Sequence, residues 1–148
     1  MSRALDLARV AAAMGEVPVG AVVTDPSGQV VAEAHNRTRA DRDPTAHAEL
    51  LAIRRATAAL GTERLAGLTL WVTLEPCAMC AGAIALARLS RLVYAAPDPK
   101  AGAVVNGPRL FGLATCHHRP EVVEGLGAAE ASQILKDFFA RLRRGDGR

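Results

Sequence analysis

The stretch Leu68–Ala96, LTLWVTLEPCAMCAGAIALARLSRLVYAA, decides the fold class of this chain. Its opening run, LTLWVTL, is mostly apolar and predicts a buried strand, and Pro76 then opens a segment that predicts a helix through about Arg88. A second apolar run at Leu92–Ala96 predicts another strand. A strand, a helix and a strand in this order form a βαβ unit, so we expect an α/β domain.

The residues before this unit predict a helix and a β-hairpin. Leu7, Val10 and Met14 recur at helical spacing, which predicts an amphipathic helix over residues 3–14 that ends at the next glycine. Two short β-branched runs follow, VGAVVTD and QVVAEAHN, and the Pro26-Ser27-Gly28 segment between them suits a tight reversal. We therefore expect a hairpin ahead of the βαβ unit.

Two more helices and one long loop complete the chain. The composition of residues 45–60 favours a helix, with Asp43 or Thr45 as its N-cap and the following glycine as its stop. Four prolines and several glycines between residues 96 and 121 predict a long ordered loop with one short helical turn. An apolar face predicts a C-terminal helix, which we expect to end in a frayed basic tail at residues 141–148. This face consists of Ala131, Ile134, Leu135, Phe138 and Leu142.

Composition is typical of a soluble globular protein. The chain has 148 residues, 50% of them hydrophobic and 22% charged, which suits one domain over residues 1–148. No apolar run approaches the ~20 residues that span a bilayer. The N-terminus lacks the pattern of a secretory signal, so we expect no membrane partner and a cytoplasmic location. The formal net charge of +3 does not by itself establish a nucleic-acid partner.

A metal site is predicted where two helices begin. Three cysteines make a poor disulfide framework, but Cys77 and Cys80 have the i, i+3 spacing that places both sulfur atoms on one face of a helix. The positive N-terminal end of a helix also stabilises thiolates. Because His47 lies at the start of the other helix, the two starts can supply a His/Cys/Cys set for one Zn²⁺ per chain, with a fourth position left for water.

Glu49 lies two residues after His47 and is the predicted acid/base. Zinc lowers the pKa of bound water toward neutrality, but hydrolysis of an aromatic amidine also requires proton transfers. In the first turn of a helix, His47 and Glu49 can still border one cavity. HAE and PCAMC together match H-x-E…P-C-x-x-C, the signature of zinc-dependent base deaminases, in which the glutamate moves protons and is not a ligand.

Nearly the whole chain resembles bacterial tRNA-specific adenosine deaminases of the TadA type, within the cytidine/deoxycytidylate deaminase superfamily. The resemblance rests on VPVGAVV, HNR, DPTAHAE, VTLEPCAMCAGA, DPKAGA, HRPEV and KDFFARLRR. It implies a three-layer cytidine-deaminase-like fold with helices on both sides of a mixed five-stranded sheet. It also implies that His47, Cys77 and Cys80 bind zinc and that Glu49 is the proton shuttle.

The resemblance further implies a substrate and partners. The wobble adenosine of a tRNA anticodon loop would be extruded into the pocket and deaminated at C6 to inosine, with Asn36 hydrogen-bonded to the base and Asp98 in contact with the ribose and backbone. Members of the family are usually homodimers whose partner helps to form the RNA groove. In the C-terminal helix, Phe139 is a candidate for nucleotide stacking and the arginines of residues 141–144 for phosphate binding, whereas Phe138 fits the core.

The loop from Val105 to His117 departs from the family pattern and leaves two alternatives open. One is a deaminase of a free nucleobase or nucleoside, such as guanine, guanosine or cytosine, because flanking loops set specificity on this scaffold. The other is a non-catalytic RNA-binding module in which Cys116 or His117 closes the fourth zinc position. Glu75 is also ambiguous, since it could cap a helix or orient the site.

Overall fold

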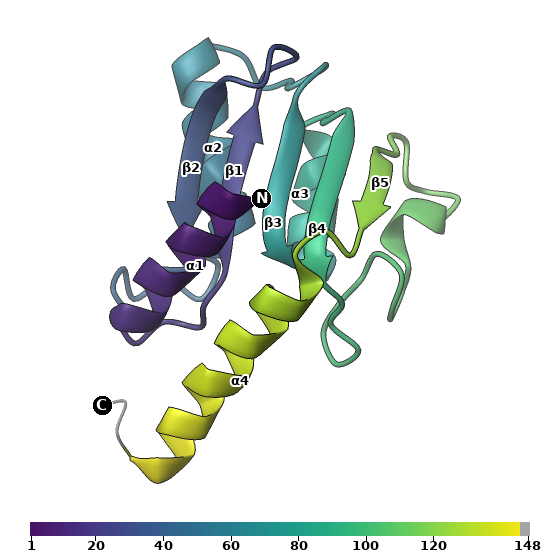
Figure 1. Ribbon diagram of the computed structural model, residues 1–148. Helices are drawn as coiled ribbons and strands as arrows, with labels where there is room; N and C mark the ends of the chain where they lie inside the picture. Colours follow the sequence, from purple (N-terminus) through teal and green to yellow (C-terminus); the bar gives the residue numbers. More distant parts are fainter. Residues whose placement is uncertain (146–148) are drawn as a thin grey trace.

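The computed structural model describes residues 1–145, which contain four α-helices, five strands and one 3-10 helix. In chain order these are α1 (Ser2–Ala13), β1 (Gly20–Thr24), β2 (Val30–His35), α2 (Ala48–Leu60), β3 (Thr69–Leu74), α3 (Ala78–Leu86), β4 (Arg91–Ala96), η1 (Leu110–Gly112), β5 (Glu121–Glu124) and α4 (Ala128–Arg144) (Figure 1). The predicted hairpin, βαβ unit, long loop with one helical turn and C-terminal helix are all present.

The strands form one mixed sheet in the order β2-β1-β3-β4-β5. β1 is antiparallel to both β2 and β3, whereas the pairs β3–β4 and β4–β5 are parallel. The mixed five-stranded sheet implied by the resemblance is therefore confirmed. The residues themselves did not predict β5, because its sequence EVVE is exposed along its whole length at the edge of the sheet and shows no alternation of apolar and polar residues.

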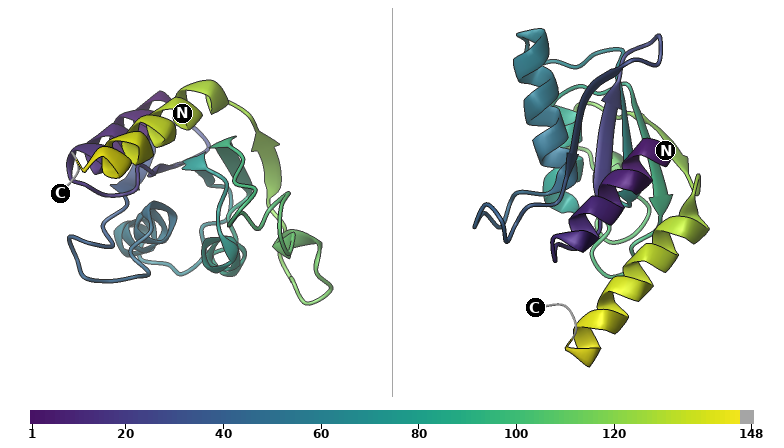
Figure 2. Two further views of the ribbon diagram at one scale, coloured as in Figure 1. Left: turned by 90° about the horizontal axis from the view of Figure 1, so that it is seen from below. Right: turned by 60° about the vertical axis from the view of Figure 1, so that its left-hand side comes forward.

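Helices cover both faces of the sheet, which confirms the three-layer architecture. α2 and α3 lie on one face, and α1 and α4 lie on the other (Figure 2). The larger core lies under α2 and α3 and includes Ile53, Leu70, Val72, Ile84 and Leu92. Each such side chain contributes about 1.5–3 kcal/mol by leaving water. Among the helices of residues 1–145, none combines the length and apolar character needed to cross a bilayer.

α1 packs unusually close to β1, and the reason is Gly20. A Cβ atom at this position would lie 2.0 Å from the carbonyl oxygen of Ala4 and 2.7 Å from the amide nitrogen of Ala8. The buried face of α1 is therefore built mostly of small residues, whereas Val10 and Met14 are exposed. The predicted helix is confirmed, but the predicted apolar stripe is wrong except for Leu7.

The ends of three helices differ from the prediction. α2 begins three residues late because the Asp43 carboxylate accepts hydrogen bonds from the N–H (2.8 Å) and hydroxyl (2.7 Å) of Thr45, which closes a turn instead of capping the helix. α3 begins two residues after Pro76. The frayed tail is wrong for residues 141–144, which continue α4 until Gly145 ends it in a left-handed conformation with φ 79°. Residues 146–148 lie outside the described part of the chain.

Candidate active site

The first turns of α2 and α3 meet at one end of the sheet, and each begins at a predicted metal ligand. His47 and Cys77 are the N-cap residues, both with extended backbone, and neither side chain makes a capping hydrogen bond. At α2 the Oδ1 atom of Asn36 instead accepts the N–H of Ala48 at 2.8 Å. Asn36 therefore performs the capping role that the sequence suggested for Asp43, and His47 keeps its ring nitrogen for another partner.

The three predicted ligands form one compact cluster. Nδ1 of His47 lies 3.6 Å from Sγ of Cys77 and 3.6 Å from Sγ of Cys80, and all three ligand atoms lie within 4.8 Å of one another. A tetrahedral zinc ion with Zn–N of about 2.0–2.1 Å and Zn–S of about 2.3 Å requires an N···S separation of about 3.6 Å. The donor set and spacing therefore fit zinc, and the metal cluster found within residues 1–145 has these three members.

The three ligand groups are also linked by their charges. A hydrogen bond from Cys80, opposed by burial and assisted by His47, lowers the pKa of the Cys77 thiol to about 4. The same hydrogen bond and burial raise the pKa of Cys80. The hydrogen bond with Cys77 raises the pKa of His47. The lowered pKa of Cys77 favours the thiolate, which is the form that binds zinc.

Glu49 lies beside this cluster without belonging to it. The residue is 4% exposed in the first turn of α2, and burial raises the pKa of its carboxyl group against smaller opposing effects from Cys80 and His47. Glu49, His47 and Cys77 line one cavity of about 250 Å³. The prediction that His47 and Glu49 border one cavity is confirmed, and the position of Glu49 suits proton transfer.

Asn36 and Asp98 lie on the wall of the same cavity. Asn36 is 8% exposed, and its Nδ2 donor has no protein acceptor among residues 1–145, although its Oδ1 atom is engaged by Ala48. Asp98 is half-buried, and its carboxylate accepts the backbone N–H groups of Lys100 and Ala101, each at 3.1 Å. The structure therefore brings both predicted substrate-binding residues to the cavity.

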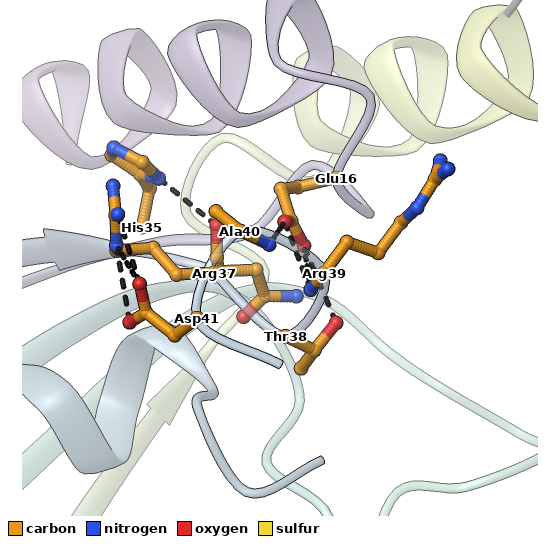
Figure 3. Close-up of polar contacts among 8 residues, drawn as sticks. Glu16, His35, Arg37, Thr38, Arg39, Ala40 and Asp41 are labelled. Atoms are coloured by element: carbon orange, nitrogen blue, oxygen red, sulfur yellow. Dashed lines mark hydrogen bonds and ion pairs between the residues drawn. The ribbon is translucent and has the colours of Figure 1, made fainter. Parts of the chain in front are cut away.

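A buried carboxylate that the sequence did not predict holds the loop after β2. Glu16 is 1% exposed and accepts hydrogen bonds from the N–H groups of Arg39 (3.0 Å) and Ala40 (2.8 Å) and from the hydroxyl of Thr38 (3.3 Å) (Figure 3). This loop carries Asn36 at its start and Thr38 on the cavity wall. A glutamate just after a helix-ending glycine ordinarily lies in solvent, so the sequence carried no signal for this role.

Cys116 and His117 do not join the metal cluster. Sγ of Cys116 donates to the carbonyl oxygen of His118 at 3.1 Å, and Nε2 of His118 contacts the carbonyl oxygen of Leu89 at 2.6 Å. Both Cys116 and His117 border a separate groove along α3. The alternative in which one of them closes a four-ligand structural site is therefore not supported.

Comparison with known proteins agrees with this geometry. The family model described as MafB19-like deaminase matches residues 1–143. A tRNA-specific adenosine deaminase of Agrobacterium fabrum is 53% identical over 146 residues, which cover 99% of this chain and 95% of the relative.

Two solved structures extend the comparison. A structure from a study of A-to-I editing by tRNA:A34 deaminases at the wobble position of transfer RNA has a TM-score of 0.89 and 54% identity, covering 91% of this chain and 97% of that chain. The guanine deaminase of Nitrosomonas europaea has a TM-score of 0.77 and 28% identity, covering 94% of this chain and 82% of that chain. The first identity is almost twice the second.

Proposed function

The chain belongs to the MafB19-like deaminase family, and on that premise we propose that it hydrolyses adenosine to inosine at the wobble position of a tRNA anticodon loop. The observation that carries the proposal is a three-residue metal cluster with a buried, non-ligating glutamate at one small cavity. The chain that holds this site is 53% identical to a tRNA-specific adenosine deaminase. Within residues 1–145 the four α-helices lie on the two faces of one sheet, which supports a single deaminase domain over residues 1–148.

His47, Cys77 and Cys80 would hold one zinc ion, and zinc when bound supplies the Lewis acidity that makes water a nucleophile at neutral pH. Glu49 is the group that moves protons. It takes a proton from the attacking water and delivers protons to N1 of the adenine ring and to the departing amine. Water adds at C6, the C6–N6 bond breaks, and one ammonia leaves for each water consumed. The burial of Glu49 supports this role, because a shielded carboxyl group exchanges protons with the substrate rather than with solvent.

The size and lining of the cavity support recognition of a single extruded base. A volume of about 250 Å³ has room for a nucleobase but not for a stacked strand, so the target adenosine would leave its stack before reaction. Nδ2 of Asn36 is free to donate to a ring acceptor of that base. Asp98 stands on the cavity wall, where its carboxylate can accept a ribose hydroxyl.

The C-terminal helix offers a surface for the rest of the RNA loop. α4 runs past the end of the sheet, and its last turn carries Arg141 and Arg143 (Figure 1). Phe139 is 42% exposed, whereas Phe138 is buried as expected. The two rings pack edge-to-face with their centroids 5.3 Å apart. An exposed aromatic ring beside arginines supports base stacking together with phosphate binding.

The outer face of α3 supports the expected homodimer. α3 is apolar on all sides, and such a helix is normally buried on all sides. Here Leu86 is 79% exposed and Met79 is 37% exposed, next to a groove of about 290 Å³ that Leu113 also lines. We therefore place the second copy of the chain on this face. The three free cysteines and the RNA substrate support a cytoplasmic location.

Product analysis on parallel substrates tests the proposed function. The zinc-loaded protein is incubated with an anticodon stem-loop that carries a wobble adenosine, with the same stem-loop carrying guanosine, and with free adenosine, guanine, guanosine, cytosine and cytidine. We expect ammonia and inosine from the adenosine stem-loop and no release by Glu49→Ala. The 28% identity to a guanine deaminase makes free guanine the second candidate substrate, and release from guanine alone would overturn the tRNA proposal.

A further inference from the structure

Glu75 is a buried carboxylate with five hydrogen-bond donors directed at it. It follows β3 and is 2% exposed. Its Oε1 atom accepts the N–H of Asp98 at 3.0 Å and the side-chain amide of Asn106 at 2.7 Å. Its Oε2 atom accepts the successive N–H groups of Val104, Val105 and Asn106, each at 3.1 Å. Both oxygens therefore hold the loop that forms one wall of the cavity.

We propose that Glu75 is a positioning residue that fixes the loop of residues 98–106 against the cavity and thereby sets how tightly the RNA substrate binds. This inference rests on the proposed function for its substrate. Asp98 belongs to the loop, and its own N–H is one of the five donors. The position of its carboxylate therefore depends on a side chain that directly follows β3 and lines the cavity.

Only a carboxylate satisfies this arrangement. Five donors surround Glu75, and a glutamine would turn an NH₂ group toward some of them, because an amide has only one acceptor oxygen. The fit is also tight in space. A Cβ atom at Gly102 would lie 2.4 Å from the carboxyl carbon of Glu75, so the loop can approach only because that residue is glycine.

The residues that directly follow the loop have backbone conformations that need support from outside. Gly107 has φ 54°, and Arg109 has φ 47°, which is unusual for a residue with a side chain. Such conformations persist where surrounding contacts over-determine them. Three consecutive N–H groups directed at one carboxylate oxygen form a nest, and this nest lies immediately before the unusual residues.

Asn106 connects the hydrogen bonds around Glu75 to the part of the chain that departs from the family pattern. It contributes two of the five donors, one from the backbone and one from the side chain. A replacement at Asn106 would therefore alter the loop position without touching the metal ligands. This makes Asn106→Ala a milder variant than Glu75→Gln. The matched control for the change of charge is Glu63→Gln, because the side chain of Glu63 is 86% exposed.

The test measures zinc content, amide hydrogen exchange and kinetics on the adenosine stem-loop for these three variants and the wild type. For Glu75→Gln we expect one zinc per chain, exchange at residues 98 and 104–106 faster by about 10-fold or more, and a KM raised by about 10-fold or more with kcat changed less than about 3-fold. Asn106→Ala should show the same pattern at about 2- to 5-fold, and Glu63→Gln should match the wild type.

Unchanged exchange in the loop would overturn the inference, as would faster exchange with an unchanged KM or a loss confined to kcat. If Glu75→Gln does not fold, Asn106→Ala decides by the same criteria. If the wild type does not deaminate the stem-loop, the proposed function fails. In that case, amide hydrogen exchange of residues 98–106 and the dissociation constant for the RNA stem-loop still report whether Glu75 positions a cavity wall that binds RNA.

Discussion

Replacing Asn36 separates two roles that its side chain performs with different atoms. Oδ1 accepts the N–H of Ala48 at 2.8 Å and so caps α2, while Nδ2 is directed to the substrate in the proposed function. Asn36→Ala removes both atoms. Asn36→Asp keeps an acceptor for Ala48 and removes the donor. The two variants should therefore differ in stability and agree in activity.

The expected magnitudes follow from the buried cap. Loss of an acceptor that satisfies an N–H at a helix start costs about 1–2 kcal/mol, which corresponds to a melting temperature lower by about 2–8 °C in a chain of this size. An aspartate at the same place retains the bond, and its negative charge at a helix N-terminus is favourable, so Asn36→Asp should melt within about 2 °C of the wild type. Loss of one hydrogen bond to the base should lower kcat/KM by about 10- to 100-fold in both variants.

Thermal unfolding of the zinc-loaded proteins and inosine formation on the stem-loop measure the two effects, with zinc content as the control for an intact metal site. A wild-type kcat/KM for Asn36→Asp would refute the assignment of Nδ2 to the substrate. A wild-type melting temperature for Asn36→Ala would refute the capping role.

Three further predictions address the acid/base group, the packing of α1 and the chain's single tyrosine. Glu49→Ala should retain one zinc per chain and lose about 10²- to 10⁴-fold in kcat, and loss of the metal or near-normal turnover would contradict its role as a non-ligating acid/base. Gly20→Ala should lower the free energy of unfolding in urea by at least about 1–3 kcal/mol because the new Cβ would lie 2.0 Å from the carbonyl oxygen of Ala4, and wild-type stability would show that α1 can shift freely. Burial and a 2.6 Å hydrogen bond to Glu124 raise the pKa of Tyr94. The contribution of its neutral phenol group to the free energy of unfolding is therefore complete below the unfolded-state pKa of about 10 and is lost as pH rises above that value. The stability difference between the wild type and Tyr94→Phe should therefore shrink from pH 9 to pH 11, and a constant difference would exclude this linkage.

Local sequence signals predicted the metal cluster and the βαβ unit because both depend on neighbouring residues. Cys77 and Cys80 are one helical turn apart, and the prolines and glycines around them mark where the chain changes direction. The convergence of His47 with these cysteines required the assumption that two helix starts meet, and the 3.6 Å separations confirm it. The assigned roles of Glu49, Asn36 and Asp98 remain predictions that kinetics must test.

The sequence did not indicate Glu16 and left the role of Glu75 open, because both residues act over long separations. Glu16 binds N–H groups more than twenty positions away, and so does Glu75, so neither belongs to a periodic pattern or a short motif. Both are charged side chains, which composition rules place in solvent. β5 was missed for a related reason, since an exposed edge strand of four residues buries too little to produce a pattern. The cap of α2 was misassigned because its acceptor, Asn36, lies twelve positions upstream.

Three consecutive residues, Glu75, Pro76 and Cys77, connect the cavity wall to the predicted metal site. Glu75 accepts hydrogen bonds from the loop, Pro76 restricts the backbone between its two neighbours, and Cys77 belongs to the three-residue group that could hold a metal ion. Because a single residue separates Glu75 from Cys77, the anchor of the loop and the predicted metal ligand can move only a short distance relative to each other. Changes of substrate range should therefore come most easily from residues 99–101 and 107–109. The first segment lies between the N–H groups that Glu75 binds, and the second lies after them. Engineering of this chain would start at those two segments and leave residues 75–77 unchanged.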